Sequence, residues 1–238
     1  MKVAIMQPYF FPYIGYFQLM DAVDTFVFYD DAQFMKGGWV NRNRILHKGE
    51  AAWWTYPIVR EDFRLTIRER RYGKSGAQLE SMKGKLEGAY RRAPRSPASC
   101  PRSAAHLAHD DDHVSGFNQA HLEGLASLLG IDCRFATSSE IDHDRTLSGQ
   151  ARVIEICRQL GATQYFNAIG GVALYDPKAF ADAGIELSFV QPGPVSYPQF
   201  DDPHVPYLSI VDVLMFNTVP QAKALLRECR HVHAGAAA

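Results

Sequence analysis

The residue types best suited to chemistry gather between positions 7 and 44, where two short apolar segments run into polar residues. The first segment, 3–6, leads into a loop rich in aromatic residues, and the second, 26–29, ends on Asp30 and Asp31. A carboxylate there can orient a sugar hydroxyl or amine, or accept its proton when burial and neighbours tune its pKa. Asp also turns the chain at strand ends, so we expect one carboxylate to turn the chain and the other to face a ligand.

The hexapeptide Trp-Val-Asn-Arg-Asn-Arg, which follows closely, is a second candidate for ligand binding. In an extended conformation, Trp39, Asn41 and Asn43 share one face. Arg42 and Arg44 then share the other face, where their planar guanidinium groups suit the oxygens of a diphosphate. Asn amides suit sugar hydroxyls or base edges, and a Trp ring suits a base or sugar ring. The alternative is a surface strand with salt-bridged arginines.

Two further groups follow later strand-like segments. Asn167 shortly precedes Gly170 and Gly171. Paired glycines let a backbone approach a ligand closely or bind an anion, although a Gly-Gly pair is also a common turn. Ser138 and Ser139 end another such segment. Their hydroxyls could contact a ligand or cap the segment that follows.

The elements that must position these residues alternate along the chain. Short apolar runs predict buried parallel strands, and apolar residues spaced three and four apart predict helices. The predicted strands are 2–6, 25–29, 53–59, 132–137, 163–167 and 185–190. The predicted helices are 14–23, 77–92, 117–129, 148–160, 177–183 and one that begins at 209. This alternation predicts an α/β fold with a mostly parallel, Rossmann-like sheet, helices on both faces and right-handed crossovers.

Length and composition indicate a single α/β domain over residues 1–230. The chain has 238 residues, of which 47% are hydrophobic and 21% charged, as in ordinary globular proteins. A basic stretch from about 60 to 116, partly helical and with a Pro/Ser-rich loop, predicts a helical insertion. Residues 231–238 are predicted to be a frayed tail.

Several classes of protein are excluded by composition. The 25 basic and 26 acidic residues nearly balance, so no overall field attracts nucleic acid. No apolar stretch reaches the roughly 18 residues that a membrane span needs. The four cysteines form no C-x-x-C pair, which argues against a zinc ribbon and predicts reduced thiols in the cytoplasm. The His- and Asp-rich stretch 106–113 fits no closed zinc pattern, so we expect a solvated loop and no metal.

Known catalytic motifs are also absent from the sequence. It contains no G-x-S-x-G, Walker, H-E-x-x-H or G-x-G-x-x-G pattern. The segment Phe11-Pro12-Tyr13-Ile14-Gly15-Tyr16 resembles the phosphate-binding loop of the HUP-type nucleotidyltransferases and amide ligases, a form that a Rossmann-like sheet can take. Tyr16 replaces the phosphate-binding histidine, and residues 3–35 contain neither His nor Lys. An ATP-dependent ligase is therefore the weakest of three functional hypotheses, and the other two, an acyl-transferring enzyme and a non-catalytic partner, are described below.

Blocks spread over nearly the whole chain carry a second resemblance. They are MQPYFFPYIGYFQL (6–19), YDD (29–31), GWVNRNRI (38–45), FNQAHLEGLASLLGI (117–131), LSGQARVIEICRQLGATQYFNAIGGVALYD (147–176) and LSIVDVLMFN (208–217). These blocks resemble the WbqC-like proteins, bacterial proteins often encoded among genes for O-antigen and other surface-polysaccharide sugars. The resemblance implies a role in that metabolism or in a related natural-product pathway.

The main hypothesis is an enzyme that transfers an acyl or aminoacyl group to the amine of an amino sugar, carried by a nucleotide. Asp30 or Asp31 would accept the amine proton, and backbone N–H groups near Gly170 and Gly171 would stabilise the oxyanion. The donor would be a thioester on coenzyme A or an acyl-carrier protein, or an acyl adenylate formed with ATP. The rival hypothesis is a non-catalytic partner that binds a nucleotide-sugar or stabilises an assembly enzyme.

The candidate residues fall into two sets. The candidate catalytic residues are Asp30, Asp31 and Lys36. The candidate substrate-binding residues are Gln7, Tyr9, Tyr16, Gln18, Trp39, Asn41, Arg42, Asn43, Arg44, Ser138, Ser139, Asn167, Gly170, Gly171 and Tyr175. An enclosed pocket formed by these residues favours the enzyme, whereas a flat apolar patch favours the partner protein.

Overall fold

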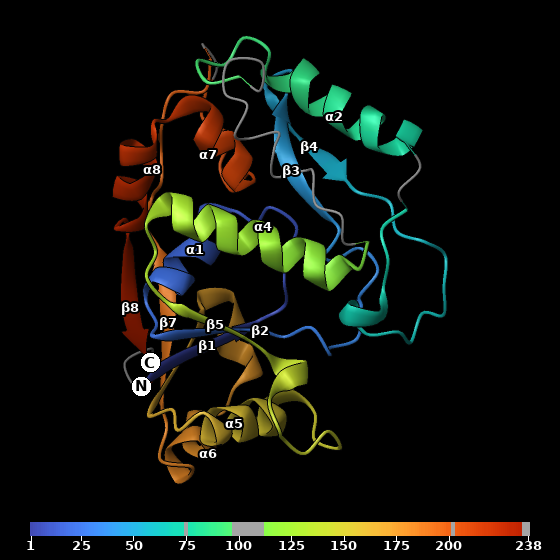
Figure 1. Cartoon of the computed structure of the whole chain (residues 1–238). Coiled ribbons are helices and arrows are strands. Elements are labelled where there is room, and N and C mark those ends of the chain that lie inside the picture. Colours follow the sequence, from blue (N-terminus) through green and yellow to red (C-terminus); the bar gives the residue numbers. More distant parts are fainter. Residues whose placement is uncertain (74–75, 97–111, 201–202, 235–238) are drawn as a thin grey trace.

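The computed structural model describes residues 1–73, 76–96, 112–200 and 203–234 (Figure 1). The strands of the main sheet are β1 (Lys2–Met6), β2 (Thr25–Phe28), β5 (Arg134–Thr137), β6 (Gln164–Ala168), β7 (Glu186–Pro192) and β8 (Cys229–His233). A separate hairpin contains β3 (Arg42–His47) and β4 (Glu50–Thr55). The helices are α1 (Ile14–Asp21), α2 (Gly76–Tyr90), α4 (Val114–Leu129), α5 (Gly149–Gln159), α6 (Pro177–Asp182), α7 (Ile210–Phe216) and α8 (Val219–Leu226). Short 3-10 helices are η1 (Ile67–Glu69), η2 (Ser138–Glu140) and η3 (Ile169–Leu174).

The main sheet has the order β5-β2-β1-β6-β7-β8. All neighbouring pairs from β5 to β7 are parallel, and only β8 runs antiparallel to its neighbour β7. The chain first moves outward from β1 to β2 and β5, then returns to the other side of β1 for β6 and β7. This reversal makes the gap between β1 and β6 a topological switch point, where open α/β sheets bind ligands. The predicted Rossmann-like α/β fold is confirmed.

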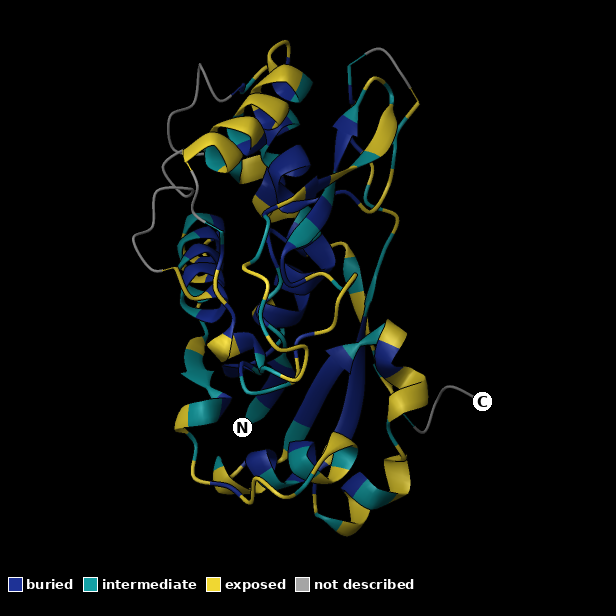
Figure 2. Cartoon of the chain, turned by 90° about the vertical axis from the view of Figure 1, so that its right-hand side faces the viewer, coloured by how far each residue is buried: buried dark blue, intermediate teal, exposed yellow. Residues whose placement is uncertain are grey.

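The central strands are buried on both faces because they are nearly continuous apolar runs, whose side chains point in turn to one face and to the other (Figure 2). Ala4, Phe26 and Phe166 belong to the core that includes α1 and α4. Val3 and Val27 belong to the second core, which includes α5 and α6. The sheet is thus covered by helices on both faces, as Figure 1 shows, which leaves the strand ends as the part of the sheet open to a ligand.

The described residues between β2 and α4 build a layer of their own, which contains the β3–β4 hairpin and α2 (Figure 1). Three hydrogen bonds join the hairpin to the helix, and in one of them the ammonium of Lys85 donates to the carbonyl of Trp53 over 2.5 Å. The indole N–H of Trp54 donates to the carbonyl of Met82 over 3.1 Å, and the amide of Leu46 donates to the hydroxyl of Tyr90 over 3.0 Å. The sequence predicted the helix and one strand at 53–59, whereas the structure forms both strands of a hairpin that begins at Arg42.

The C-terminal end differs from its prediction. Residues 231–233, predicted to fray, belong to β8 and pair with β7, so that prediction is wrong for them. The segment lacks apolar alternation because β8 is an edge strand with mostly exposed His and Arg side chains. The helix predicted from 209 ends at Phe216, and Thr218 then caps a separate helix, α8. Residues 235–238 and most of the stretch 106–113 lie outside the described residues.

Among the residues that the structure describes, no helix is long and apolar enough to cross a membrane.

A buried carboxylate joins α7 to the inserted layer and to the loop before α7. Asp212 is fully buried and accepts hydrogen bonds from the hydroxyls of Tyr90 and Tyr197, each over 2.8 Å. The side-chain amide of Gln199 donates to it over 2.6 Å. Burial raises the pKa of Asp212, and the three donors only partly oppose that shift.

The Asp212→Asn variant tests this carboxylate. The amide directs a donor at Tyr90 or Tyr197, so we expect a loss of about 1–3 kcal/mol in unfolding free energy at pH 7. Because the folded pKa lies above the unfolded value of about 3.9, protonation of Asp212 stabilises the wild type. That stability is complete below the unfolded pKa and is lost as pH rises through the folded pKa. Urea unfolding should therefore show the gap between the two proteins widening from pH 7 toward pH 4; a constant gap contradicts the shift.

Candidate functional site

The loop from Gln7 to Tyr13, between β1 and α1, forms one wall of the candidate site. Its central aromatic residues turn into the core, where Phe10 is 1% and Phe11 4% exposed. Phe11 has a φ of +40°, an unusual conformation for a bulky residue. The surrounding structure must hold the backbone in this shape.

Buried polar side chains from three other elements hold this loop. The Asn43 amide, on β3, donates to the carbonyls of Phe10 and Phe11 over 3.1 and 3.0 Å. Ser209, at the start of α7, donates to the Phe11 carbonyl over 2.6 Å. Asn118, on α4, donates to the Pro8 carbonyl over 2.8 Å. The loop carbonyls are thus satisfied without regular secondary structure.

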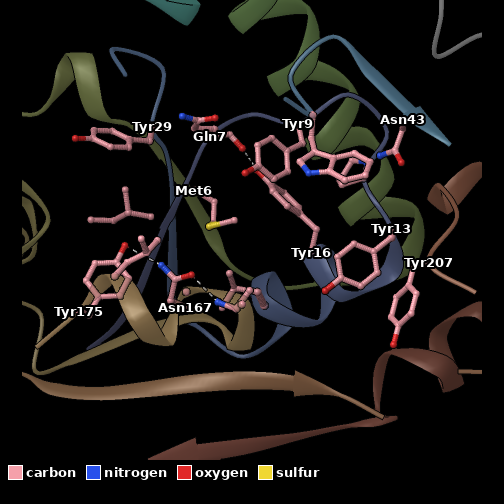
Figure 3. Close-up of a pocket in the computed structure, with 18 of the residues that line it drawn as sticks. Met6, Gln7, Tyr9, Tyr13, Tyr16, Tyr29, Asn43, Asn167, Tyr175 and Tyr207 are labelled. Atoms are coloured by element: carbon pink, nitrogen blue, oxygen red, sulfur yellow. Dashed lines mark hydrogen bonds between the residues drawn. The ribbon is translucent and has the colours of Figure 1, made fainter. Parts of the chain in front are cut away.

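A pocket of about 580 Å³ opens beside this loop, at the carboxyl ends of β1 and β6 (Figure 3). It therefore lies at the switch point of the sheet. Aromatic side chains dominate its lining: Tyr9, Tyr13, Tyr16, Tyr29, Trp39, Tyr175 and Tyr207. The other lining residues are Ile5, Met6, Gln7, Pro12, Leu19, Asn43, Arg44, Asn167, Ala168, Gly170, Gly171 and Leu174.

The phenols of the pocket are neutral hydrogen-bonding groups. Burial raises the pKa of Tyr9, and the nearby Tyr175 adds to that shift. Burial likewise raises the pKa of Tyr175 and Tyr29. The Asn167 amide donates to the Tyr175 hydroxyl over 3.0 Å, which fixes that ring against the end of β6. At neutral pH these hydroxyls stay protonated, so they can donate hydrogen bonds to a ligand.

Arg44 supplies the charge of the pocket. It is the one charged side chain among the described residues that line the pocket. Its Nε is buried and has no hydrogen-bond partner, and its guanidinium lies 5.8 Å from the centre of the Trp39 ring. An unpaired buried donor costs about 1–3 kcal/mol, more when charged, so this geometry favours an anionic ligand.

Arg42, two residues before Arg44, does not line the pocket. Its guanidinium lies 4.0 Å from the centre of the Trp53 ring and donates to the carbonyls of Gly37 and Gly38. The predicted alternation holds for Asn41 and Asn43, which are buried. It fails for Trp39, whose ring lies 5.4 Å from that of Trp53 on the arginine side. The reason is that β3 begins only at Arg42, so Trp39 precedes the extended segment.

The carboxylates of Asp30 and Asp31 form a separate cluster outside the pocket lining. Asp30 is 4% exposed and accepts hydrogen bonds from the hydroxyl of Ser138 over 3.1 Å. The amide and hydroxyl of Ser139 donate to it over 3.0 and 2.8 Å. Asp31 accepts from the hydroxyl of Ser138 over 2.5 Å. The structure thus brings these four predicted residues together, but their side chains form hydrogen bonds with one another and do not line the pocket.

Basic residues that the sequence did not single out complete the cluster around Asp31. Arg152 pairs with Asp31, and Arg145 does so over 3.2 Å. The Nε of Arg152 also donates to Nε2 of His143 over 3.0 Å, and Nδ1 of His143 lies 2.8 Å from the Ile141 carbonyl oxygen. Arg152 lies 5.3 Å from the centre of the Tyr29 ring, which lines the pocket. The cluster therefore supports the pocket wall through Tyr29.

Three other candidates lie away from the pocket. Gln18 is 1% exposed, and its amide donates to the carbonyls of Leu225 and Glu228 at the end of α8. Asn41 donates to the carbonyl of Tyr56 over 2.9 Å. Lys36 is exposed in a turn.

Ten of the predicted binding residues do line the pocket: Gln7, Tyr9, Tyr16, Trp39, Asn43, Arg44, Asn167, Gly170, Gly171 and Tyr175. The hydroxyl of Tyr16 donates to the Gln7 carbonyl over 2.7 Å, so it braces the loop. A Cβ on Gly171 would lie 2.9 Å from Oδ1 of Asn167, so glycine permits this close approach. Tyr13, Tyr29 and Tyr207 also line the pocket but were not predicted as binding residues. The strand-end position of Tyr29 was a usable signal, whereas Tyr207 lies in an irregular segment and gave none.

Groups that could bind a metal ion or act as thiol nucleophiles can be described for part of the chain. The described part contains no group of three or more His, Cys, Asp or Glu side chains placed to hold a metal ion. Burial raises the pKa of Cys133 to about 11 and that of Cys157 to about 12. Both thiols therefore stay protonated and weakly nucleophilic at neutral pH.

The fold and the pocket together define a Rossmann-like α/β protein with an aromatic pocket at its switch point. Comparison with protein families matches residues 7–224 to the WbqC-like protein family, and the chain belongs to that family. It is similar to "Uncharacterized protein Rv1507c" of Mycobacterium tuberculosis, with 31% identity over 234 residues that cover 96% of this chain and 99% of the relative. No solved structure matches the chain.

Gly15 in α1 provides a test of the pocket wall. A Cβ at this position would lie 2.3 Å from ring atoms of Tyr13, so the tyrosine ring occupies the space that a side chain would fill. Gly84, in the middle of α2, has open space around it. We expect Gly84→Ala to gain up to about 1 kcal/mol of unfolding free energy from helix propensity. Gly15→Ala should lose about 1–3 kcal/mol through overpacking. Urea unfolding measures both, and an equal gain in the two variants would contradict this packing.

Proposed function

We propose that the chain is an enzyme that transfers an acyl or aminoacyl group to the amine of a nucleotide-linked amino sugar. The observation that carries the proposal is the aromatic pocket at the switch point, with Arg44 as its charged lining residue. Most small-molecule sites combine such a largely apolar hollow with a few polar groups. A role in surface-polysaccharide or related metabolism rests on the family resemblance alone.

The groups around the pocket match the parts of such a substrate. The unpaired Nε of Arg44 suits a phosphate oxygen, and the Trp39 ring beside it suits a base or sugar ring. The hydroxyls of Tyr9 and Tyr175 suit the sugar hydroxyls. The ligand's phosphate would thus lie at the β3 side of the pocket and its sugar above the ends of β1 and β6.

In the reaction, the amine nitrogen attacks the carbonyl carbon of a thioester donor. A C–N bond forms, the C–S bond breaks, and the leaving thiolate takes up the proton that the amine loses. Neutral phenols whose pKa is raised by burial, as at Tyr9 and Tyr175, can donate to the oxyanion that develops. Asp30 and Asp31, expected to accept the proton, are engaged by serine and arginine side chains, and Asp31 supports Tyr29 through Arg152.

A second function, binding of the same nucleotide-sugar without catalysis, is favoured by one observation. Among the described residues, no carboxylate or imidazole lines the pocket. The two functions differ in turnover: the enzyme forms an N-acylated product from an acyl thioester and an amino sugar nucleotide, whereas the binding protein does not.

A comparison of Arg44→Gln with Arg42→Gln tests the proposal. Both arginines lie on β3 next to a tryptophan ring, but only Arg44 lines the pocket. A ligand at 100 times its Kd stabilises a protein by about 2.7 kcal/mol, which raises the Tm of a chain this size by roughly 5–10 °C. We expect UDP-glucosamine to produce this shift in the wild type and in Arg42→Gln, and a much smaller one in Arg44→Gln.

Free UDP, ATP and coenzyme A thioesters complete the panel, and chromatography of reaction mixtures detects the acylated sugar. A shift with UDP-glucosamine but without product, for every thioester offered, would support the binding protein. Equal shifts in the two arginine variants would show that the sugar nucleotide does not use this pocket.

A further inference from the structure

A second hollow, of about 550 Å³, lies next to the pocket along the same edge of the sheet. It is formed where β7 ends at Gln191 and Pro192 and where β8 begins. Because β7 follows β6 in the parallel sheet, its carboxyl end lies on the same side as the pocket. The hollow is therefore a continuation of the crevice in which such sheets bind ligands.

A narrow cavity of about 90 Å³ lies between the two. It shares Tyr13 and Tyr207 with the pocket, and it shares Tyr207 and the segment 192–194 with the second hollow. Its lining is mostly proline, aromatic and aliphatic. The three hollows thus follow one another, with a thin apolar neck in the middle.

Tyr207 is the residue that all three hollows have in common. Its side chain is 68% exposed, and its ring meets the ring of Tyr13 edge-on with 6.3 Å between centres (Figure 3). Its φ of +58° lies in the left-handed region that non-glycine residues rarely adopt. Such outliers cluster at ligand-binding segments, where the surrounding structure holds them in place.

The second hollow carries its own positive charge. Arg227, Glu228 and Arg230 are its charged lining residues, a balance of one positive charge. Arg230 donates through Nε to the side chain of Gln191 over 2.9 Å, which leaves the outer edge of its guanidinium free to bind. Arg227 forms no ion pair with any of the described residues. Two arginine forks at one hollow suit the oxygens of a phosphate or diphosphate.

We propose that the second hollow binds the phosphate-bearing end of the acyl donor, a small-molecule thioester of the coenzyme A type. The thin arm of the donor lies along the neck beside Tyr207, and its thioester reaches the pocket where the amine is held. This inference rests on the proposed function and adds the class of the donor. It also assigns the phosphates of the two substrates to different sites: Arg44 binds those of the sugar nucleotide, and Arg227 with Arg230 binds those of the donor.

Titration calorimetry with two probes, coenzyme A and UDP-glucosamine, tests this separation. The variants are Arg44→Gln and the double variant Arg227→Gln/Arg230→Gln, with Arg158→Gln on the exposed side of α5 as the control. We expect the double variant to bind coenzyme A at least about tenfold more weakly and UDP-glucosamine unchanged. Arg44→Gln should show the reverse, and the control should match the wild type for both probes.

The outcomes separate this inference from the proposed function. Failure of coenzyme A to bind the wild type, or its loss in Arg44→Gln rather than in the double variant, overturns the donor site. Binding of a phosphopantetheinylated carrier protein without binding of coenzyme A also overturns it, because the donor would then be a protein. Failure of UDP-glucosamine alone contradicts the proposed acceptor and leaves the coenzyme A comparison intact.

Discussion

The pocket depends on the hydrogen bonds that hold the loop from Gln7 to Tyr13. The carbonyls of Pro8, Phe10 and Phe11 would be buried without partners if Asn118, Asn43 and Ser209 did not donate to them. These donors come from α4, β3 and α7, which are far apart in the sequence. The loop therefore takes its shape only when the helical layer, the hairpin and the C-terminal helices have all packed together.

This constraint explains why a Rossmann-like sheet carries an additional layer. The sheet supplies the ends of β1 and β6, but it offers no cation to a ligand there. The hairpin adds Arg44, the segment just before it adds Trp39, and packing of the hairpin against α2 keeps Arg44 in place. Outside the pocket lining, the ion pair of Asp31 with Arg152 supports the ring of Tyr29. Some of the polar and charged residues thus line the pocket, whereas others hold its lining residues in place.

The sequence predicted the parallel strands of the sheet and about half of the residues that line the pocket. Periodicity located the parallel strands, and the rule for strand ends pointed to Gln7 and Asn167, which line the pocket. It could not show that Arg44 lines the pocket and Arg42 does not, because the two positions differ only in where they lie relative to the start of the hairpin. It gave no signal for Tyr207, since irregular segments have no period. Asp30 and Asp31 were brought to a strand end as expected, but the arginines that neutralise Asp31 lie more than a hundred residues away.

A crystal structure of the chain with UDP-glucosamine would test the central claim, that the switch-point pocket binds an anionic sugar derivative. The account predicts ligand density in the pocket, with a phosphate oxygen within hydrogen-bond distance of the Arg44 guanidinium and the sugar ring among Tyr9 and Tyr175. Ligand bound elsewhere, or bound in the pocket with its phosphates away from Arg44, would contradict it.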